Sequence, residues 1–528
     1  MTKPHVFVTM GDVTKLVCDA WLLPGDTRPH VSNKWTHIPG IREYIDKNVT
    51  DAFKRGTQLT LPLHGMARDS QAVPILAPVD GMLRGKDHLE AVVNDFVRVG
   101  AGIAEKRAAL DTAKTGGPWR EKPLLAMPLF GSGNGGFASR KGELVSMFLE
   151  ILPAAAEQYN VDIALVLFND NKSYAMAQSI RRKSNRWDAL DSRLVEQAKS
   201  LAKKAMKGEL VPFMGAGVSA AAGMPGWLSM LNELANRAKL TPEQKSALFE
   251  SNLDLLDQAS FIESSFHGED GPRQFRQAIA DLVGSRNYAL PSALLASLRC
   301  EQAITMNYDA LYESAYESTG KSLSVIPDSH VTDSPNWLLK LHGSATEPHT
   351  IVLTRDDYLG YNTSREALSA IVKANLITRH ILFVGFGLVD PHFHQIMHDV
   401  KRAIPGMASF ATAITEIDEP HLAELWKNNL EVRPMMSAQK PDANRAQSRR
   451  LIEVFLDVIG AYATDGHEYL LDDDYRTGLS DEDLALRAAL NTFLASAPTG
   501  LEKSASWQRV ARLFSDLGQT KATPQDPA

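Results

Sequence analysis

The residues with the clearest chemical meaning begin at a glycine-rich turn. The apolar run Leu210 to Met214 ends in Gly215-Ala216-Gly217 and continues into small residues that include Ser219. This order predicts a strand, a tight turn and the start of a helix, where backbone N–H groups and the helix dipole can hold a pyrophosphate. Glycine allows the backbone to approach phosphate oxygens closely. Small residues also serve close packing, so the turn alone indicates no more than a candidate dinucleotide site.

Polar residues follow two later apolar runs. Asn307 and Asp309 come after Ala303 to Met306, and His342 comes after Trp337 to Leu341. An imidazole can take a proton from a hydroxyl group or a water near neutral pH, which makes His342 a candidate base. Each residue also has a structural alternative, because Asn and Asp are common in Asx turns and an isolated histidine is most often structural.

A further segment places two glycines and an acid after another apolar run. Gly385, Gly387 and Asp390 follow Ile381 to Val384. Because glycine has no side chain, the main chain at Gly385 and Gly387 could contact a cofactor directly. Asp390 before Pro391 would serve equally well as a helix N-cap followed by proline at the first helical position.

The elements that must position these residues alternate between strand and helix. After Leu210, short apolar runs recur at 302–306, 337–342, 381–387 and 410–415, with helix-like stretches between them. This alternation predicts an α/β fold with a doubly wound parallel sheet and a ligand site at its carboxyl edge. The segment Asn232 to Asn287 is helix-like throughout.

The first part of the chain has the same alternating character. The runs of strand length lie at 5–9, 20–23, 72–76, 124–129 and 163–168, and the stretches 86–110 and 141–158 look helical. A three-layer α/β domain is therefore expected here as well.

Four segments resemble, in their order, the motifs of the sirtuin family. They are GAGVS at 215–219, TMNYD at 305–309, LKLHG at 339–343 and FVGFGLVDP at 383–391. The variant resembled is the sirtuin-like NADase of bacterial anti-phage systems, such as the Thoeris effectors. The resemblance covers roughly residues 200–462 and implies a Rossmann-type doubly wound parallel sheet with a helical insert over the pocket.

The resemblance implies roles for individual residues. Asn307 holds the nicotinamide ribose and helps to place the attacking water, and His342 is the catalytic histidine. Asp309 accepts a hydrogen bond from the nicotinamide carboxamide. Sirtuins usually carry Ser where Gly387 stands, so a backbone contact would have to substitute there. The expected cofactor-binding set is Gly215, Ala216, Gly217, Ser219, Asp309, Gly385, Gly387 and Asp390.

The implied reaction consumes NAD as a substrate. NAD is cleaved to nicotinamide and ADP-ribose, or cyclised, so that NAD is depleted during infection. Cleavage at the anomeric carbon passes through an oxocarbenium-like state, which oriented dipoles and a base can stabilise.

Departures from the sirtuin pattern favour NAD cleavage by water over deacylation. The two cysteines, Cys18 and Cys300, cannot form the four-cysteine zinc site that protein-deacylating sirtuins usually carry, so no zinc is expected. No residues are predicted to bind another metal. Met306 stands where deacylases often have Gln. Residues 224–227, MPGW, replace the Pro-Asp-Phe-Arg of the deacylases. Two alternatives stay open: a sirtuin-type deacylase or ADP-ribosyltransferase, and a non-catalytic ADP-ribose- or NAD-binding module.

The N-terminal region resembles macro domains, which bind ADP-ribose. Residues 11–16 with 19–24 are similar to the opening of that family, and 128–136 to its phosphate loop. By this resemblance Asp12 meets an adenine amino group. The residues expected around the diphosphate are Gly131, Ser132, Gly133, Asn134 and Gly135.

The macro-like region also departs from its family. Pro24-Gly25-Asp26 replaces the family's Asn-Ala-Asn segment, and the glycine-rich loop that should follow is missing. A binding module or a scaffold is therefore expected rather than an ADP-ribosyl hydrolase. We expect it to bind an ADP-ribose-derived signal that regulates NAD cleavage. The alternative is that it builds an oligomer or docks a partner ATPase.

Composition sets the broad limits. A chain of 528 residues with 44% hydrophobic and 23% charged residues predicts two or three globular domains. A net charge of −7 without a long Lys/Arg block disfavours direct nucleic-acid binding. Two cysteines, no signal peptide and no apolar run of about 18 residues indicate a reduced, cytoplasmic protein without a membrane span.

The predicted domains follow from these patterns. They are a macro-like domain, a connecting helix, a sirtuin-like catalytic domain and a C-terminal helical tail, at 1–185, 186–209, 210–463 and 464–528. Amphipathic terminal helices most often make packing or oligomer contacts, so a homo-oligomer is expected, with a defence-system partner protein as a further candidate.

Overall fold

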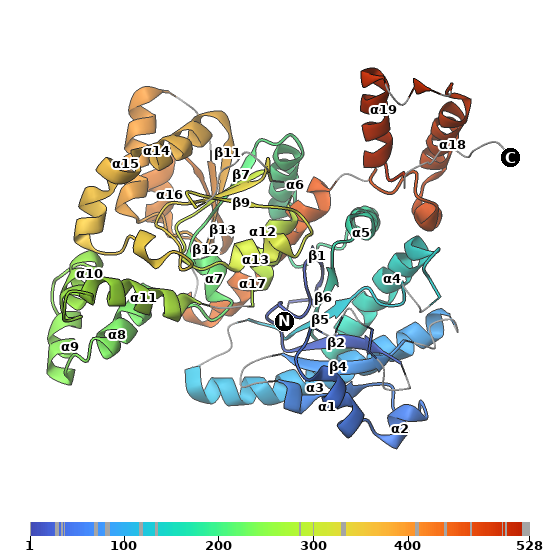
Figure 1. Ribbon diagram of the computed structural model, residues 1–528, viewed down its shortest axis with the longest axis horizontal. Coiled ribbons are helices and arrows are strands. Elements are labelled where there is room, and N and C mark those ends of the chain that lie inside the picture. The colour runs from blue at the N-terminus through green and yellow to red at the C-terminus, as the bar shows by residue number, and fades with distance from the viewer. Residues whose placement is uncertain are drawn as a thin grey trace. The chain divides into compact units, whose positions relative to one another are not determined.

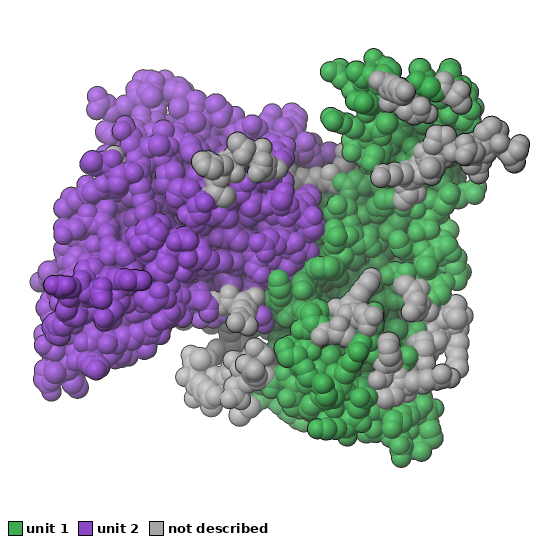
Figure 2. All heavy atoms as spheres, in the orientation of Figure 1, with its two compact units in different colours: residues 1–199, 454–528 green, residues 200–453 purple. Residues whose placement is uncertain are grey.

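The computed structural model of the chain describes residues 2–26, 31–32, 35, 37–67, 72–79, 85–115, 120–132, 136–284, 287–298, 300–328, 334–406, 411–437, 441–464, 467–498, 500–501 and 504–519. The chain divides into two compact units, which Figure 2 shows in different colours. Unit 1 comprises residues 1–199 and 454–528, and unit 2 comprises residues 200–453.

Unit 1 is built on a six-stranded sheet. Its order is β1-β6-β5-β2-β4-β3, and every pair is parallel except β3 with β4. The strands are β1 (Val6–Met10), β2 (Ala20–Gly25), β3 (Leu61–Pro62), β4 (Val73–Pro78), β5 (Leu124–Pro128) and β6 (Asp162–Leu167). All six residues of β6 are buried, as expected for a parallel strand covered on both faces. The predicted α/β class is confirmed.

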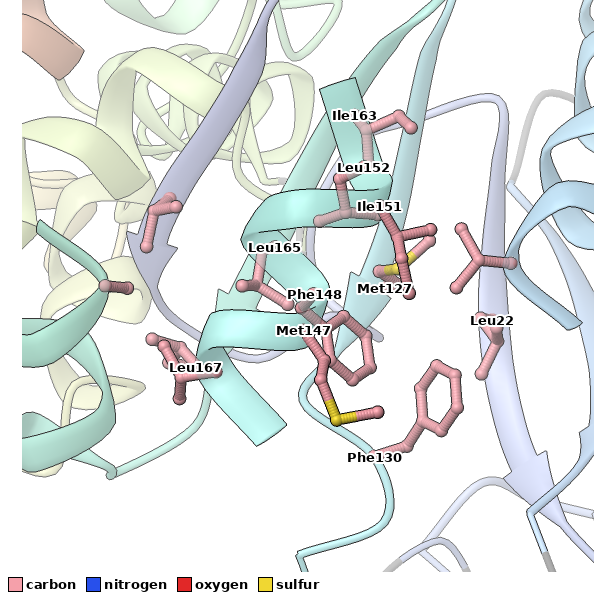
Figure 3. Packing of buried hydrophobic residues seen from close by; sticks show 14 of the residues in the cluster. Leu22, Met127, Phe130, Met147, Phe148, Ile151, Leu152, Ile163, Leu165 and Leu167 are labelled. Atoms are coloured by element: carbon pink, nitrogen blue, oxygen red, sulfur yellow. The ribbon is translucent and has the colours of Figure 1, made fainter. Parts of the chain in front are cut away.

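The helices of unit 1 are α1 (Ile41–Asn48), α2 (Asp51–Lys54), α3 (Lys86–Thr115), α4 (Lys141–Tyr159), α5 (Asn171–Ser184), α18 (Asp481–Ser496) and α19 (Ala505–Asp516), with the 3-10 turns η2 (His64–Met66) and η6 (Asp473–Gly478). Residues of α3, α4 and α5 share one hydrophobic core with the sheet. In Figure 3, Phe148 and Ile151 of α4 lie against Met127 of β5 and Leu165 of β6. Each such side chain contributes roughly 1.5–3 kcal/mol when fully buried.

The C-terminal residues pack with the N-terminal sheet rather than apart from it. Asp457, on the last turns of α17 (Pro441–Ala463), is fully buried and accepts hydrogen bonds from His5 Nε2 at 2.7 Å and Arg181 Nη1 at 2.9 Å. Burial alone would raise the pKa of Asp457, but Arg181 and His5 outweigh it and hold that pKa below its ordinary value. This buried network joins residues within unit 1 that are far apart along the chain. The two units divide at 199 and 453, whereas the predicted boundaries lie at 185, 209 and 463; the domain assignment itself stays a prediction.

Unit 2 holds a seven-stranded sheet in which every pair is parallel. Its order is β13-β12-β11-β7-β8-β10-β9. The strands are β7 (Leu210–Met214), β8 (Gln302–Thr305), β9 (Ser324–Ile326), β10 (Trp337–Lys340), β11 (His380–Val384), β12 (Ala411–Ile417) and β13 (Glu431–Met436). Along the chain, β8, β9 and β10 follow β7 and lie on one side of it, and β11, β12 and β13 come next and lie on its other side. The strand order therefore reverses at β7 and β11, where ligands bind in doubly wound sheets.

Helices join these strands, and four of them form an insert. The helices of unit 2 are α7 (Ala216–Ala220), α8 (Trp227–Arg237), α9 (Pro242–Phe249), α10 (Leu255–Ser264), α11 (Gly271–Val283), α12 (Leu290–Ser297), α13 (Leu311–Glu317), α14 (Arg355–Thr378), α15 (Pro391–Ala403) and α16 (Pro420–Trp426), with the 3-10 turn η5 (Pro348–Thr350); α6 (Ser192–Met206) spans the boundary between the units. Figure 1 shows α8 to α11 as one green group. Their apolar cluster includes Tyr308, Ile351 and Leu353 from the loops after β8 and β10, which holds the insert at the carboxyl ends of the strands.

Across the described residues, no helix is both long and apolar enough to cross a membrane.

Candidate functional site

A cavity of about 580 Å³ opens at the carboxyl ends of β7, β8, β10 and β11. This volume lies within the range of small-molecule sites. The predicted site residues that line it are Gly215, Ala216, Ser219, Asn307, Asp309, His342, Gly385, Gly387 and Asp390. Four loops far apart in the sequence thus meet around one space, as the strand pattern implied.

The glycine turn and the loop after β11 are pressed together. Gly217 N–H donates to Gly385 O at 2.9 Å, and Gly215 N–H donates to Val384 O at 3.0 Å. A Cβ on Gly217 would lie 2.7 Å from Gly385 Cα, and Gly385 itself has a φ of +62°. Close packing, the structural alternative for these glycines, is therefore present. Gly217 does not line the cavity, whereas Gly215 and Ala216 do.

Asn307 is held by the glycine turn. Its Nδ2 donates to Gly215 O and to Ser219 Oγ, each at 3.0 Å, and its backbone N–H donates to Thr305 Oγ1 at 3.0 Å. Turning the amide over would set two oxygens against each other at Gly215, so this orientation is the favourable one. Both amide protons are then used, which leaves Asn307 Oδ1 to accept from a hydroxyl group or a water in the cavity.

His342 is a buried, neutral imidazole at the cavity wall. Its side chain is 3% exposed, and burial lowers its pKa to about 4. Its Nε2 lies 3.2 Å from His392 Nδ1, and its ring packs against Tyr358 and Tyr361. A neutral imidazole with one unprotonated nitrogen can take a proton at ordinary pH.

The two predicted acids both take part in local backbone structure. Asp390 Oδ1 accepts from Phe393 N–H at 3.1 Å and caps α15, while its Oδ2 accepts from the Tyr358 hydroxyl at 2.8 Å. Asp309 Oδ1 accepts from Leu311 N–H at 3.1 Å, as in an Asx turn. Both residues also line the cavity, so these local bonds coexist with a place at the site.

Sequence reasoning missed Lys340, which lies beneath the site. Its side chain is 0% exposed, and its Nζ donates to Tyr308 O at 3.2 Å, to Asp309 O at 2.5 Å and to Glu313 Oε1 at 2.7 Å. It fixes the loop that carries Asn307 and Asp309. A single lysine inside the apolar run WLLKL was the signal that could have indicated a buried, paired cation.

An ion pair closes the insert side of the cavity. Arg355, at the start of α14, donates to both carboxylate oxygens of Asp257, at 2.9 and 3.0 Å, and also pairs with Asp254. Arg355 and Asp254 line the cavity together with Trp227 and Leu256. The insert therefore contributes an apolar wall and the carboxylate of Asp257, which accepts the bidentate contact from Arg355.

One group of side chains has the chemistry of a metal site. Ligand atoms of His342, Asp390 and His392 lie within 4.8 Å of one another. Each of these three side chains already has a hydrogen-bond partner: His392 for His342, Tyr358 for Asp390 and the Tyr358 carbonyl for His392. These hydrogen bonds connect the three side chains through Tyr358 and through each other. The expectation of no zinc rested on the cysteines and does not address this group.

The predicted macro-like ligand residues lie at strand ends of unit 1. Asp12 follows β1, and its Oδ1 accepts from Thr14 N–H at 2.9 Å and Thr14 Oγ1 at 2.7 Å. Gly131 and Ser132 follow β5, and Gly131 has a φ of +92°. The remaining predicted residues, Gly133, Asn134 and Gly135, lie outside the described residues.

The site residues of unit 2 can be compared with known proteins. A family model for the SIR2-like domain matches residues 301–435, which include Asn307, His342 and Gly385. The chain is 29% identical over 221 residues to Defense-associated sirtuin 2 of Bacillus subtilis, covering 40% of this chain and 21% of that protein.

Two further relatives share a different name. The chain is 30% identical over 202 residues to NAD(+) hydrolase ThsA of Enterococcus faecium, covering 37% of this chain and 40% of that protein. It is 28% identical over 212 residues to NAD(+) hydrolase ThsA of Bacillus cereus, covering 39% and 42%. The chain spans less than half the length of each of these relatives. The match at residues 301–435 shows a SIR2-like domain in this chain, and Asn307, His342 and Gly385 lie within the matched residues.

Proposed function

We propose that this chain is an NAD glycohydrolase that cleaves NAD to nicotinamide and ADP-ribose. The observation that carries the proposal is the meeting of Asn307, His342 and the glycine turn around one cavity in a SIR2-like domain. Relatives named NAD(+) hydrolase support the same substrate. The alternative product is cyclic ADP-ribose.

The chain's own residues suit the chemistry of such a cleavage. Asn307 Oδ1 accepts from a ribose hydroxyl or from the attacking water, and neutral His342 takes the proton that the nucleophile loses. Breaking the bond to nicotinamide leaves positive charge on the ribose, which the carbonyl dipole of Asn307 stabilises. Trp227 and Leu256 of the insert help to exclude bulk water from the intermediate.

The proposed biological role is anti-phage defence by depletion of cytoplasmic NAD. One relative's name contains "defense-associated", which supports this role. We propose further that the macro-like region binds an ADP-ribose-derived signal that controls the SIR2-like domain. Assembly into a homo-oligomer or docking of a defence-system partner is the alternative use of that region.

The test is nicotinamide release from NAD by the purified full chain, followed by chromatography with and without ADP-ribose derivatives. Free ADP-ribose or its cyclic form as the second product supports the proposal. O-acyl-ADP-ribose formed with an acylated peptide would instead identify a deacylase. Cleavage that survives both Asn307→Ala and His342→Ala would contradict the site assignment.

A further inference from the structure

His392 is held rigidly beside the proposed base. It is buried on the first turn of α15, and its ring stacks on Tyr358 with centroids 4.1 Å apart and lies 3.9 Å from the Tyr361 ring. Asp390 caps the same turn. The ring plane and both nitrogen positions of His392 are therefore determined by its surroundings.

The partners of His392 determine where its proton lies. Its Nε2 is 3.2 Å from the carbonyl oxygen of Tyr358, and a carbonyl oxygen can only accept. Nε2 must therefore carry the proton. Burial lowers the pKa of His392, so the ring is neutral and holds one proton only. Nδ1 of His392 is consequently an unprotonated acceptor.

The same reasoning extends to His342. Its Nε2 lies 3.2 Å from that bare Nδ1, and two unprotonated nitrogens would repel each other, so His342 Nε2 must donate. His342 is also neutral, and its single proton is then used. The other ring nitrogen, Nδ1, is left with a free lone pair.

We propose that His392 is a positioning residue that holds His342 in the Nε2–H tautomer, so that Nδ1 of His342 is the atom that takes the proton. This inference rests on the proposed NAD cleavage for its role in catalysis. The order of donation is His342 Nε2–H to His392 Nδ1, and His392 Nε2–H to the Tyr358 carbonyl. The proton taken by Nδ1 makes His342 an imidazolium, and Asp390 is the nearby carboxylate that favours it.

Variants of the full chain test the positioning role. His392→Phe keeps an aromatic ring between the two tyrosines but removes the acceptor, and kcat for NAD cleavage should fall about 10–100-fold with KM nearly unchanged. His392→Asn places a carbonyl oxygen near the former Nδ1 and should recover most of that loss. His398→Phe, at an exposed position on the same helix, is the matched control and should retain the wild-type kcat. Wild-type kcat in His392→Phe would overturn the proposal.

Nitrogen NMR tests the tautomer without any turnover. In a ¹⁵N-histidine-labelled chain, the signals lost in His342→Ala identify His342, and long-range ¹H–¹⁵N spectra report which ring nitrogen is protonated. We expect Nε2–H in the wild type and a mixture of tautomers in His392→Phe. The Nδ1–H tautomer in the wild type would overturn the proposal, and so would added Zn²⁺ that binds tightly and shifts both histidines, because both nitrogens would then be ligands. If the tautomer is as proposed but no NAD is cleaved, the proposed function fails instead.

Discussion

The two units of this chain use the same architecture for different purposes. Each has a sheet whose strand pairs are parallel, apart from β3 with β4 in unit 1, and a glycine-containing turn at the carboxyl end of a strand. In unit 2 the buried side chain of His342 and the half-buried side chain of Asp390 lie at the wall of the cavity. In unit 1 the buried polar group of Asp457, Arg181 and His5 instead joins the C-terminal residues to the N-terminal sheet.

This contrast separates two roles of a buried titratable side chain. Asp457 is paired on both oxygens by partners that are themselves buried, which is the pattern of a structural tie. His342 has a single partner for its ring nitrogens among the described residues and faces a space that a ligand can fill. Perturbed groups at a cavity indicate function more strongly than perturbed groups inside a core.

The largest expected effect is on the stability of unit 1. Asp457→Ala leaves Arg181 and His5 buried without their acceptor and should cost about 3–5 kcal/mol of unfolding free energy. Urea denaturation followed by circular dichroism measures it. Asp188→Ala, which removes an exposed partner of Lys3, is the control and should leave the transition in place. Equal effects from both variants would show that the buried network is not a structural tie.

Asn307 should show the opposite balance between activity and stability. Asn307→Ala removes the Oδ1 acceptor at the cavity, and kcat for nicotinamide release should fall about 10²–10³-fold, as for the loss of one preorganised polar group in other enzymes. The urea midpoint should shift much less than in Asp457→Ala, because Asn307 is only half-buried. A large stability loss with unchanged kcat would assign Asn307 to structure.

The junction of the two glycine loops gives a smaller effect. Gly385→Ala forces a side chain into a left-handed backbone conformation and places Cβ 2.5 Å from Val218 N. The left-handed conformation alone costs about 1–2 kcal/mol, and the clash adds to it. Gly406→Ala, at a φ of +87° with open space around it, isolates the conformational part. Thermal melting of the two variants should rank Gly385→Ala as the less stable.

The smallest expected effect is the pH dependence of unit 2. Burial lowers the pKa of both His342 and His380 to about 4 in the folded chain, from 6.5 in the ordinary case. The unfolded chain therefore binds more protons as the pH falls, and stability present above pH 6.5 is lost toward pH 4.

For His342 this loss amounts to about 1 kcal/mol at pH 5.5. Thermal melting of the full chain between pH 7 and pH 5 measures this loss of stability, and His380→Asn should make the melting temperature depend less on pH. If His342 is the base, NAD cleavage should persist well below pH 6.5, whereas an ordinary histidine pKa would end it there.

The sequence by itself determined the local elements and the positions of the polar residues at their ends. Continuous apolar runs such as 210–214 and 381–384 predict buried parallel strands, because a strand covered on both faces has no polar side to show. Asn307 and His342 could likewise be placed after strands, from the apolar runs 303–306 and 337–341. Order, spacing and residue type are local properties, and they also carried the resemblance to sirtuins.

Only the tertiary structure decided which of these ends meet and what each residue touches. Because β7 and β11 are neighbours in the sheet, Gly217 lies against Gly385, so Gly217 serves close packing and does not line the cavity. His392 belongs to none of the predicted site residues, and its proposed role follows from its contacts with Tyr358 and His342. Such contacts depend on strand order and on how the connections cross the sheet. A pattern of neighbouring residues cannot specify them, because each contact joins segments that are distant along the chain.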